Sequence, residues 1–303
     1  MIVLTIIKPG VFLTQDNISN VLWAISVFGI MTCGTISVIL SGGIDLSIGS
    51  TAGLSGVIIY RTFLARGFNA EAVLPGILLA LLVGCLIGVF HGLVVTQFKI
   101  PPFLVTLATS SVINGIAIAI TNGETFGILE PEAFLRYGRG QNPIYLMALF
   151  AILSYILLNK TVFGRKIYAV GGNSIASELS GVRANLITTT AYVLSGFTAA
   201  LGGLLLSSMA QQASSMMGRG YEMDVITAIV VGGASLAGGE GTIQGAIFGA
   251  VLVGLINNGL NLMNVPSTYH PVVKGVVIIA AVAFDFYIKE REQRNPKRAS
   301  STT

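Results

Sequence analysis

Carboxamide side chains gather near the end of one apolar segment and are the residues best suited to hold a small polar solute. Asn257, Asn261 and Asn264 stand at i, i+4 and i+7, with Asn258 beside them in INNGLNLMN. This spacing predicts that the first three lie on one face of a helix. Because an amide donates and accepts hydrogen bonds, such a face suits a hydroxyl-rich solute such as a sugar; it also suits hydrogen bonding between helices and helix capping. Both uses stay open, and the three are candidate translocation residues.

A second candidate for the translocation path is Asp45, in the sequence GGIDLSIG that begins at Gly42. An ionisable group near a helix break in a membrane protein usually faces a cavity or a partner. A carboxylate at a helix N-terminus is also stabilised by the helix dipole without any ligand. The sequence alone does not decide between these two interpretations.

Residues for catalysis or metal binding are sparse. His91 and His270 lie near opposite ends of different apolar segments, and the chain contains no HExxH, GxSxG or P-loop lysine motif. Glu222 and Asp224 precede a short apolar segment, where a helix N-terminus or an outward-facing loop explains them. We therefore expect no catalytic residue, no metal site and no cofactor in this chain.

The composition predicts an all-α integral membrane protein, a polytopic helical bundle. Of 303 residues, 53% are apolar and only 10% are charged, against about 25% charged residues in soluble domains. Such a chain has no surface that indicates nucleic-acid binding. Nine apolar segments are the predicted spans: Ile18–Leu40, Ile44–Leu64, Val73–Val95, Phe103–Ile120, Ile144–Leu158, Leu186–Met209, Val225–Leu236, Ile243–Met263 and Val272–Ile288.

Two of these segments, Ile144–Leu158 and Val225–Leu236, are shorter than the roughly 20 residues that a spanning helix needs. Each is predicted to be either a span extended by its flanks or a broken, re-entrant piece packed inside protein. The nine segments form a single transmembrane domain over residues 1–288, followed by a basic tail at 289–303.

Glycines recur every fourth residue in two segments, at Gly84, Gly88 and Gly92 and at Gly241, Gly245 and Gly249. Such stripes let a neighbouring backbone approach closely, and we expect tight helix packing there, with helix sliding or a dimer contact as the alternative. Two glycine clusters, GGIDLSIG at Gly42 and GGASLAGG at Gly232, also resemble each other and suggest remnants of an internal repeat.

The polar segment Phe163–Ala184 interrupts the apolar sequence and is predicted to form a short amphipathic helix outside the hydrocarbon. Asn173 or Ser174 is the candidate N-cap, and Gly181 is the expected stop. Ile175, Leu179 and Val182 share one helical face. We expect this face to be offered to a soluble partner.

Basic residues give the expected orientation. With the tail inside, ten Lys and Arg fall on the cytoplasmic side and seven outside; without the five of the tail the count is five to seven. The tail therefore decides that the C-terminus and the loop 160–184 are expected in the cytoplasm, and an odd number of spans then places Met1 outside.

Four motifs together resemble the membrane permease subunit of ribose-type ABC importers, a family that also includes branched-chain amino-acid permeases. They are SGGIDLSIGS at Ser41, FGRKIYAVGGNSIASELSGV at Phe163, GYEMDVITAIVVGGASLAGGEGTIQGAIFGA at Gly220 and INNGLNLMNVPSTYHPVVKGVVI at Ile256. The resemblance extends over nearly the whole chain and is closer to the monosaccharide branch. It implies a bacterial cell (inner) membrane protein that is not an enzyme.

The resemblance also implies partners. They are a cytoplasmic ATP-binding subunit that uses ATP and Mg, an extracytoplasmic sugar-binding protein, a second permease copy or paralogue, and membrane lipid. The residues that would dock on the ATP-binding subunit are Gly171, Gly172, Asn173, Ser177, Glu178, Leu179 and Gly181. Candidate docking points for the binding protein are Arg61, Arg66, Arg136, Arg139 and Arg219, which solvated loop charges would also explain.

Family members usually have one more apolar helix before Asn17, so Met1–Ile7 resembles its last part and ten spans are expected in a longer chain. An ABC permease for an amino acid or signalling molecule is the alternative function. A secondary transporter is less well supported, because the spans contain almost no charge away from their ends.

Overall fold

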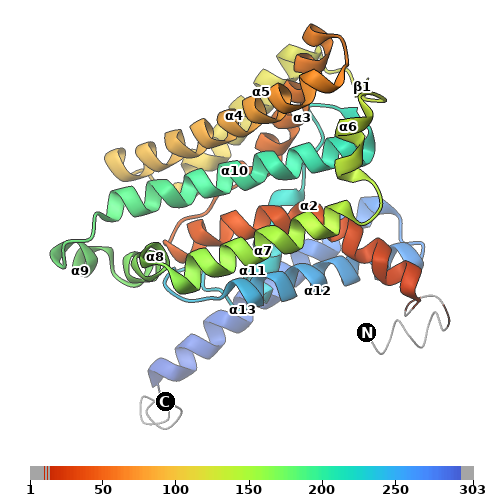
Figure 1. Cartoon of the computed structure of the whole chain (residues 1–303). Coiled ribbons are helices and arrows are strands. Elements are labelled where there is room, and N and C mark those ends of the chain that lie inside the picture. The colour runs from red at the N-terminus through yellow and green to blue at the C-terminus, as the bar shows by residue number, and fades with distance from the viewer. Residues whose placement is uncertain (1–9, 11, 13, 295–303) are drawn as a thin grey trace.

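The computed structural model describes residues 10, 12 and 14–294, and most of them are helical (Figure 1). Seven of the described helices are long and apolar enough to cross a membrane, which confirms the predicted polytopic bundle. They are α2 (Gln15–Leu40), α3 (Ile48–Arg66), α4 (Ala70–Phe98), α5 (Pro102–Thr121), α7 (Asn142–Lys160), α10 (Ala184–Ala210) and α12 (Ile243–Leu262).

Shorter elements connect and complete these helices. They are α6 (Glu132–Leu135), η1 (Arg136–Gly138), α8 (Val162–Gly172), α9 (Ser174–Leu179), α11 (Tyr221–Val231), η2 (Ser267–Tyr269), α13 (His270–Arg294) and the paired strands β1 (Phe126–Gly127) and β2 (Gln212–Ala213). Residues 295–303 of the predicted tail, and the expectations for Met1–Ile7, lie outside the described residues.

The two short predicted segments have different outcomes. Ile144–Leu158 is extended by its flanks into the 19-residue helix α7, long enough to cross a membrane. Val225–Leu236 instead corresponds to α11, which has 11 residues and is too short to span a bilayer. The predicted broken helix is therefore α11.

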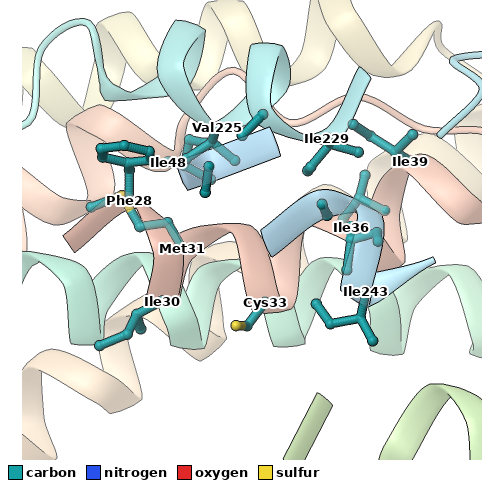
Figure 2. Close-up of a cluster of buried hydrophobic side chains, with 14 of the residues drawn as sticks. Phe28, Ile30, Met31, Cys33, Ile36, Ile39, Ile48, Val225, Ile229 and Ile243 are labelled. Carbon is teal, nitrogen blue, oxygen red and sulfur yellow. The ribbon is translucent and has the colours of Figure 1, made fainter. Parts of the chain in front are cut away.

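Helix α2 is the centre of the bundle and the most buried of the seven long helices. Its apolar side chains form one cluster with residues of α3, α11 and α12, shown in Figure 2. The labelled members are Phe28, Ile30, Met31, Cys33, Ile36, Ile39, Ile48, Val225, Ile229 and Ile243. Because α2 contacts both α10 and α12, a displacement of this helix would reach most of the bundle.

The glycine stripe of α4 lies against α10 along the length of both helices. A Cβ atom built on Gly84 would lie 2.4 Å from the carbonyl oxygen of Gly196, and one on Gly88 would lie 2.3 Å from that of Tyr192. A Cβ on Gly92 would lie 2.4 Å from Cα of Thr189. The expected close helix packing is thus confirmed, since no side chain larger than hydrogen fits at these positions.

Gly88→Ala is expected to lower the stability of the solubilised protein by about 1–3 kcal/mol, because its methyl group would force α4 and α10 apart. Gly115→Ala on α5 is the matched control, because a Cβ there meets no atom within 4 Å. Thermal unfolding in detergent measures both variants. Equal midpoints for the two would contradict the close approach of α4 and α10.

Candidate translocation site

Two segments near the start of α3 interrupt the helical bundle. One is Ser41–Ser47 between α2 and α3, and the other is residues 211–220 between α10 and α11. A Cβ on Gly218 would lie 2.3 Å from the carbonyl oxygen of Gly49, so the backbones touch without side chains between them. Gly203, beyond the midpoint of α10, packs on Ala52 in the same way. The second interruption is therefore packed against α3, as expected for irregular backbone, which is tolerated within a membrane only against protein or a polar cavity.

Asp45 fixes the first interruption. Its buried carboxylate accepts hydrogen bonds from the Ser47 N–H (2.9 Å), the Ser47 hydroxyl (2.6 Å) and the Ser195 hydroxyl of α10 (2.7 Å). These bonds hold Ile44–Ser47 in a non-helical path, so the start predicted for this span at Ile44 is wrong and α3 begins at Ile48. Asp45 is bonded to the chain itself, and its place on a translocation path stays a prediction.

The predicted carboxamides lead to the principal cavity, of about 870 Å³, which lies between α2, α11, α12 and α13. Asn257 and Asn261 line it, and the buried carbonyl oxygen of the Asn257 side chain accepts no hydrogen bond from the described residues. Asn264 does not share their face, because α12 ends at Leu262 and Asn264 has a positive φ of 56°. The structure therefore brings together two of the three predicted carboxamides.

Asn258 has the other use that the sequence left open for amides. Its side chain exchanges hydrogen bonds with that of Asn17 on α2, at 2.9 and 3.1 Å. This reciprocal pair joins α12 to α2 at the mouth of the cavity, which Asn258 also lines. It is the interhelical bonding that carboxamides commonly provide in membrane proteins.

A buried ion pair and aromatic rings form the rest of the cavity wall. The Lys274 ammonium of α13 lies 2.7 Å from one carboxylate oxygen of Asp224 and donates to the other at 2.9 Å. Trp23 also lines the cavity, and its indole N–H donates to the Gly138 carbonyl oxygen (3.0 Å). Carboxylate, ammonium, amide and aromatic groups together can bind a polar solute that also has an apolar face.

Sequence reasoning missed this pair, because it assigned Asp224 to a helix N-terminus or an outward-facing loop and counted Lys274 only as one of the seven outer basic residues. The partners are 50 residues apart in sequence, so no local pattern links them. The available signal was that each is a charge beside an apolar segment, which in a membrane protein calls for a partner.

The polar loop forms two short helices where one was expected. Asn173 separates them and is the N-cap of α9, accepting the Ala176 N–H at 2.9 Å, as predicted. Helix α9 ends where Gly181 takes φ +82°, with the Gly181 and Val182 N–H groups donating to the Glu178 and Ser177 carbonyls. This is a glycine-terminated helix end, and it confirms Gly181 as the stop.

Most residues predicted for partner docking lie on the surface of this loop. Gly172, Asn173, Glu178, Leu179 and Gly181 are exposed. Ser177, in contrast, is buried and Gly171 is packed against backbone, so neither is exposed on the surface of the single chain. The apolar side chains of Leu179 and Ile175 are 86% and 71% exposed, an unusual state for residues on a six-residue helix in water.

Two glycine-containing turns meet the C-terminal end of α8 beneath the loop, and we call Leu40–Gly42, Gly171–Gly172 and Gly238–Gly241 the glycine junction. The Gly239 N–H donates to the Leu40 carbonyl oxygen at 2.9 Å. A Cβ on Gly171 would lie 1.8 Å from that same oxygen. The Tyr168 hydroxyl of α8 donates to the Gly241 carbonyl (2.9 Å), and burial raises its pKa, so it remains a neutral donor. The junction joins the loop to α2 and to the turn between α11 and α12.

The five arginines predicted to meet a binding protein are all exposed. Arg136 and Arg139 adjoin α6, at the end of the molecule opposite α8 and α9 (Figure 1), and Arg139 is paired with Glu132. Arg61 and Arg66 lie in the last turns of α3. Arg219 differs, because it lines the principal cavity.

Comparison with known proteins gives a consistent set of relatives. The family described as the permease component of branched-chain amino acid transport systems matches residues 17–282. The chain is 38% identical to the ribose import permease protein RbsC of Bacillus subtilis over 295 residues, 94% of this chain and 89% of that protein.

Two other sugar permeases are more distant relatives. The L-arabinose ABC transporter permease protein AraH of Azospirillum brasilense is 33% identical, covering 95% of this chain and 84% of that protein. The xylose transport system permease protein XylH of Escherichia coli is 30% identical, covering 96% of this chain and 90% of that protein. No solved structure matches the chain.

Lys274→Met is expected to destabilise the protein by about 3 kcal/mol, because it leaves the Asp224 carboxylate buried without its cation. This loss of stability is at the lower end of the range for breaking a buried ion pair, because the Lys274 side chain is 21% exposed. The double variant Asp224→Asn with Lys274→Met should regain most of the loss, as measured by thermal unfolding in detergent. A Lys274→Met variant that unfolds at the same temperature as the wild type would contradict the buried ion pair.

Proposed function

Because the chain belongs to the family of permease components named above, we propose that it is the transmembrane subunit of an ATP-binding cassette importer and forms the translocation path for a monosaccharide. The observation that carries this proposal is the 38% identity, over 94% of the chain, to a ribose import permease. The arabinose and xylose permeases among the relatives support the same solute class.

The principal cavity favours a sugar over a branched-chain amino acid. Its lining includes four carboxamides, an ion pair and Trp23. Sugar hydroxyls both donate and accept, so they match amides and carboxylates, and the apolar face of a pyranose or furanose ring matches an aromatic ring. An aliphatic side chain would leave these polar groups without partners, at a cost in binding free energy.

The proposal includes partners outside this chain. An ATP-binding subunit would dock on Gly172, Asn173, Glu178, Leu179 and Gly181 and hydrolyse ATP with Mg. An extracytoplasmic binding protein would deliver the sugar to the opposite end, where Arg61, Arg66, Arg136 and Arg139 lie. A second permease copy or a paralogue would complete the transporter. This arrangement requires α8, α9 and the C-terminus in the cytoplasm, as the basic residues also suggest.

Co-expression with candidate ATP-binding subunits tests the proposal. The complex should co-purify, and in proteoliposomes that contain the binding protein its ATPase rate should rise with D-ribose, L-arabinose or D-xylose and not with leucine. Stimulation by leucine alone would indicate an amino-acid permease. Failure of any ATP-binding subunit to co-purify would contradict membership of an importer.

Two glycine variants test the coupling role. Gly171→Ala should displace α8 from the glycine junction, because its methyl group would lie 1.8 Å from the Leu40 oxygen. Gly115→Ala on α5 is the control, because a Cβ there meets no atom within 4 Å and the residue lies outside both the junction and the docking surface. We expect Gly171→Ala to retain ATPase activity and to lose at least about tenfold in sugar uptake, equivalent to about 1.4 kcal/mol. Equal uptake by the two variants would contradict transmission through the junction.

Glu178→Arg tests the docking surface itself. The side chain is exposed and takes part in no ion pair among the described residues, so its replacement should leave folding unchanged. We expect the variant to insert normally and to bind the ATP-binding subunit more weakly, measured as the amount that co-purifies. Binding of the ATP-binding subunit at the wild-type level would show that Glu178 is not part of the docking surface.

A further inference from the structure

Helix α5 has a polar patch in the middle of an otherwise apolar span. Ser110, Ser111 and Asn114 lie near the centre of this 20-residue helix, and all three are partly or fully exposed within the single chain. The helix is among the least buried of the long ones. Polar side chains at this depth are costly against lipid and normally face a cavity or another protein.

These three residues line a second cavity, of about 300 Å³, whose other wall is the start of α3 and the segment between α10 and α11 with the first turn of α11. Its lining is mostly polar and comes from the start of α3, from α5 and from the segment that leads into α11. The residues are Gly49, Ser50, Ser110, Ser111, Asn114, Ser215, Met216, Arg219 and Glu222. Arg219 also lines the principal cavity, so the two cavities share one wall residue.

Several of these groups have hydrogen-bonding capacity that the described part of the chain does not use. The side chains of Ser110, Asn114 and Arg219 form no hydrogen bond with any described residue. The Glu222 carboxylate accepts the Gly220 N–H, at 3.0 and 3.1 Å, and is bonded to no other side chain of the described residues. Thr109, next to the patch, is different, because its hydroxyl donates to the Val105 carbonyl of its own helix at 2.7 Å.

We propose that this cavity is a second carbohydrate-contact site, at which Glu222 accepts hydrogen bonds from sugar hydroxyls while Arg219 and Asn114 donate to them. The inference rests on the proposed function and deepens it. A carboxylate between a guanidinium and an amide matches the alternating donors and acceptors of a polyhydroxylated ring. Arg219, on the wall of both cavities, would contact the sugar as it passes from one to the other.

The composition of the site argues against a metal ion as its ligand. No group of three or more His, Cys, Asp or Glu side chains that could hold a metal occurs among the described residues. Hard cations prefer several oxygen ligands with a net negative charge, whereas here one carboxylate stands near one guanidinium. A neutral solute rich in hydroxyl groups fits this charge balance.

Thiol labelling tests the site without depending on transport. In a Cys85→Ser background, Ser111→Cys should react with a hydrophilic thiol reagent in membranes, and D-ribose, L-arabinose or D-xylose should slow the reaction. The matched control is Val112→Cys, whose native side chain is 59% exposed on an apolar face of α5 and should remain unreactive. An unreactive Ser111→Cys, or a rate that none of the three sugars changes, would overturn the inference.

Uptake kinetics separate this inference from the proposed function. Glu222→Gln retains an acceptor for the Gly220 N–H, so the start of α11 should persist, and removes the charge that a sugar would use. We expect the KM for uptake to rise about tenfold or more, and Asn114→Ala to raise it less. Thr109→Ala should have the wild-type KM, because the Thr109 hydroxyl is bonded within its own helix.

The two failures are distinguishable. Suppose that the wild-type transporter takes up D-ribose, L-arabinose or D-xylose and that Glu222→Gln and Asn114→Ala have the same KM as the wild type. The proposal of a second site is then wrong and the proposed function stands. If the wild type takes up none of these sugars and none protects Ser111→Cys, both proposals fail.

Discussion

The fold depends on one constraint: a backbone that leaves helical geometry inside a membrane protein must find its hydrogen bonds and its packing within the protein. Here the segment between α10 and α11 packs on the first turn of α3, through Gly218 and Gly49. Asp45 supplies three acceptor contacts that hold the first interruption in its path and tie it to α10. These contacts offset the free-energy cost of the helical hydrogen bonds that the two interruptions lose. The polar cavities beside them can hold a solute.

Helix α11 connects the two regions of functional interest. At its N-terminus, Glu222 and Asp224 line the second and the principal cavity respectively. Its C-terminus leads through Gly232 into the turn that forms part of the glycine junction. In the proposed transporter, an 11-residue rigid element thus links the loop helices to both cavities. Movement of α9 by a docked subunit would reach the cavities without deforming the long helices.

The features that the sequence could predict are those set by local chemistry. Apolar length predicts the seven long spans among the nine segments expected, four-residue glycine spacing predicts the contact of α4 with α10, and Asn173 and Gly181 mark the ends of α9. In each case the neighbouring residues in sequence determine the outcome.

The features that could not be predicted are long-range or depend on where a helix ends. Asp224 and Lys274 pair across two helices. Asn264 leaves the carboxamide face only because α12 stops at Leu262. Ser177 is buried, although the residues on either side of it in α9 are exposed. Each required the three-dimensional packing of elements that sequence patterns describe one at a time.

The central claim is that α9 presents an apolar and acidic surface to the cytoplasm for an ATP-binding subunit. Labelling of Leu179→Cys in a Cys85→Ser background tests it most directly, because this side chain is 86% exposed. A membrane-impermeant thiol reagent should label it in inside-out vesicles and not in intact cells, and co-expression of the ATP-binding subunit should abolish the labelling. Labelling in intact cells would contradict the account.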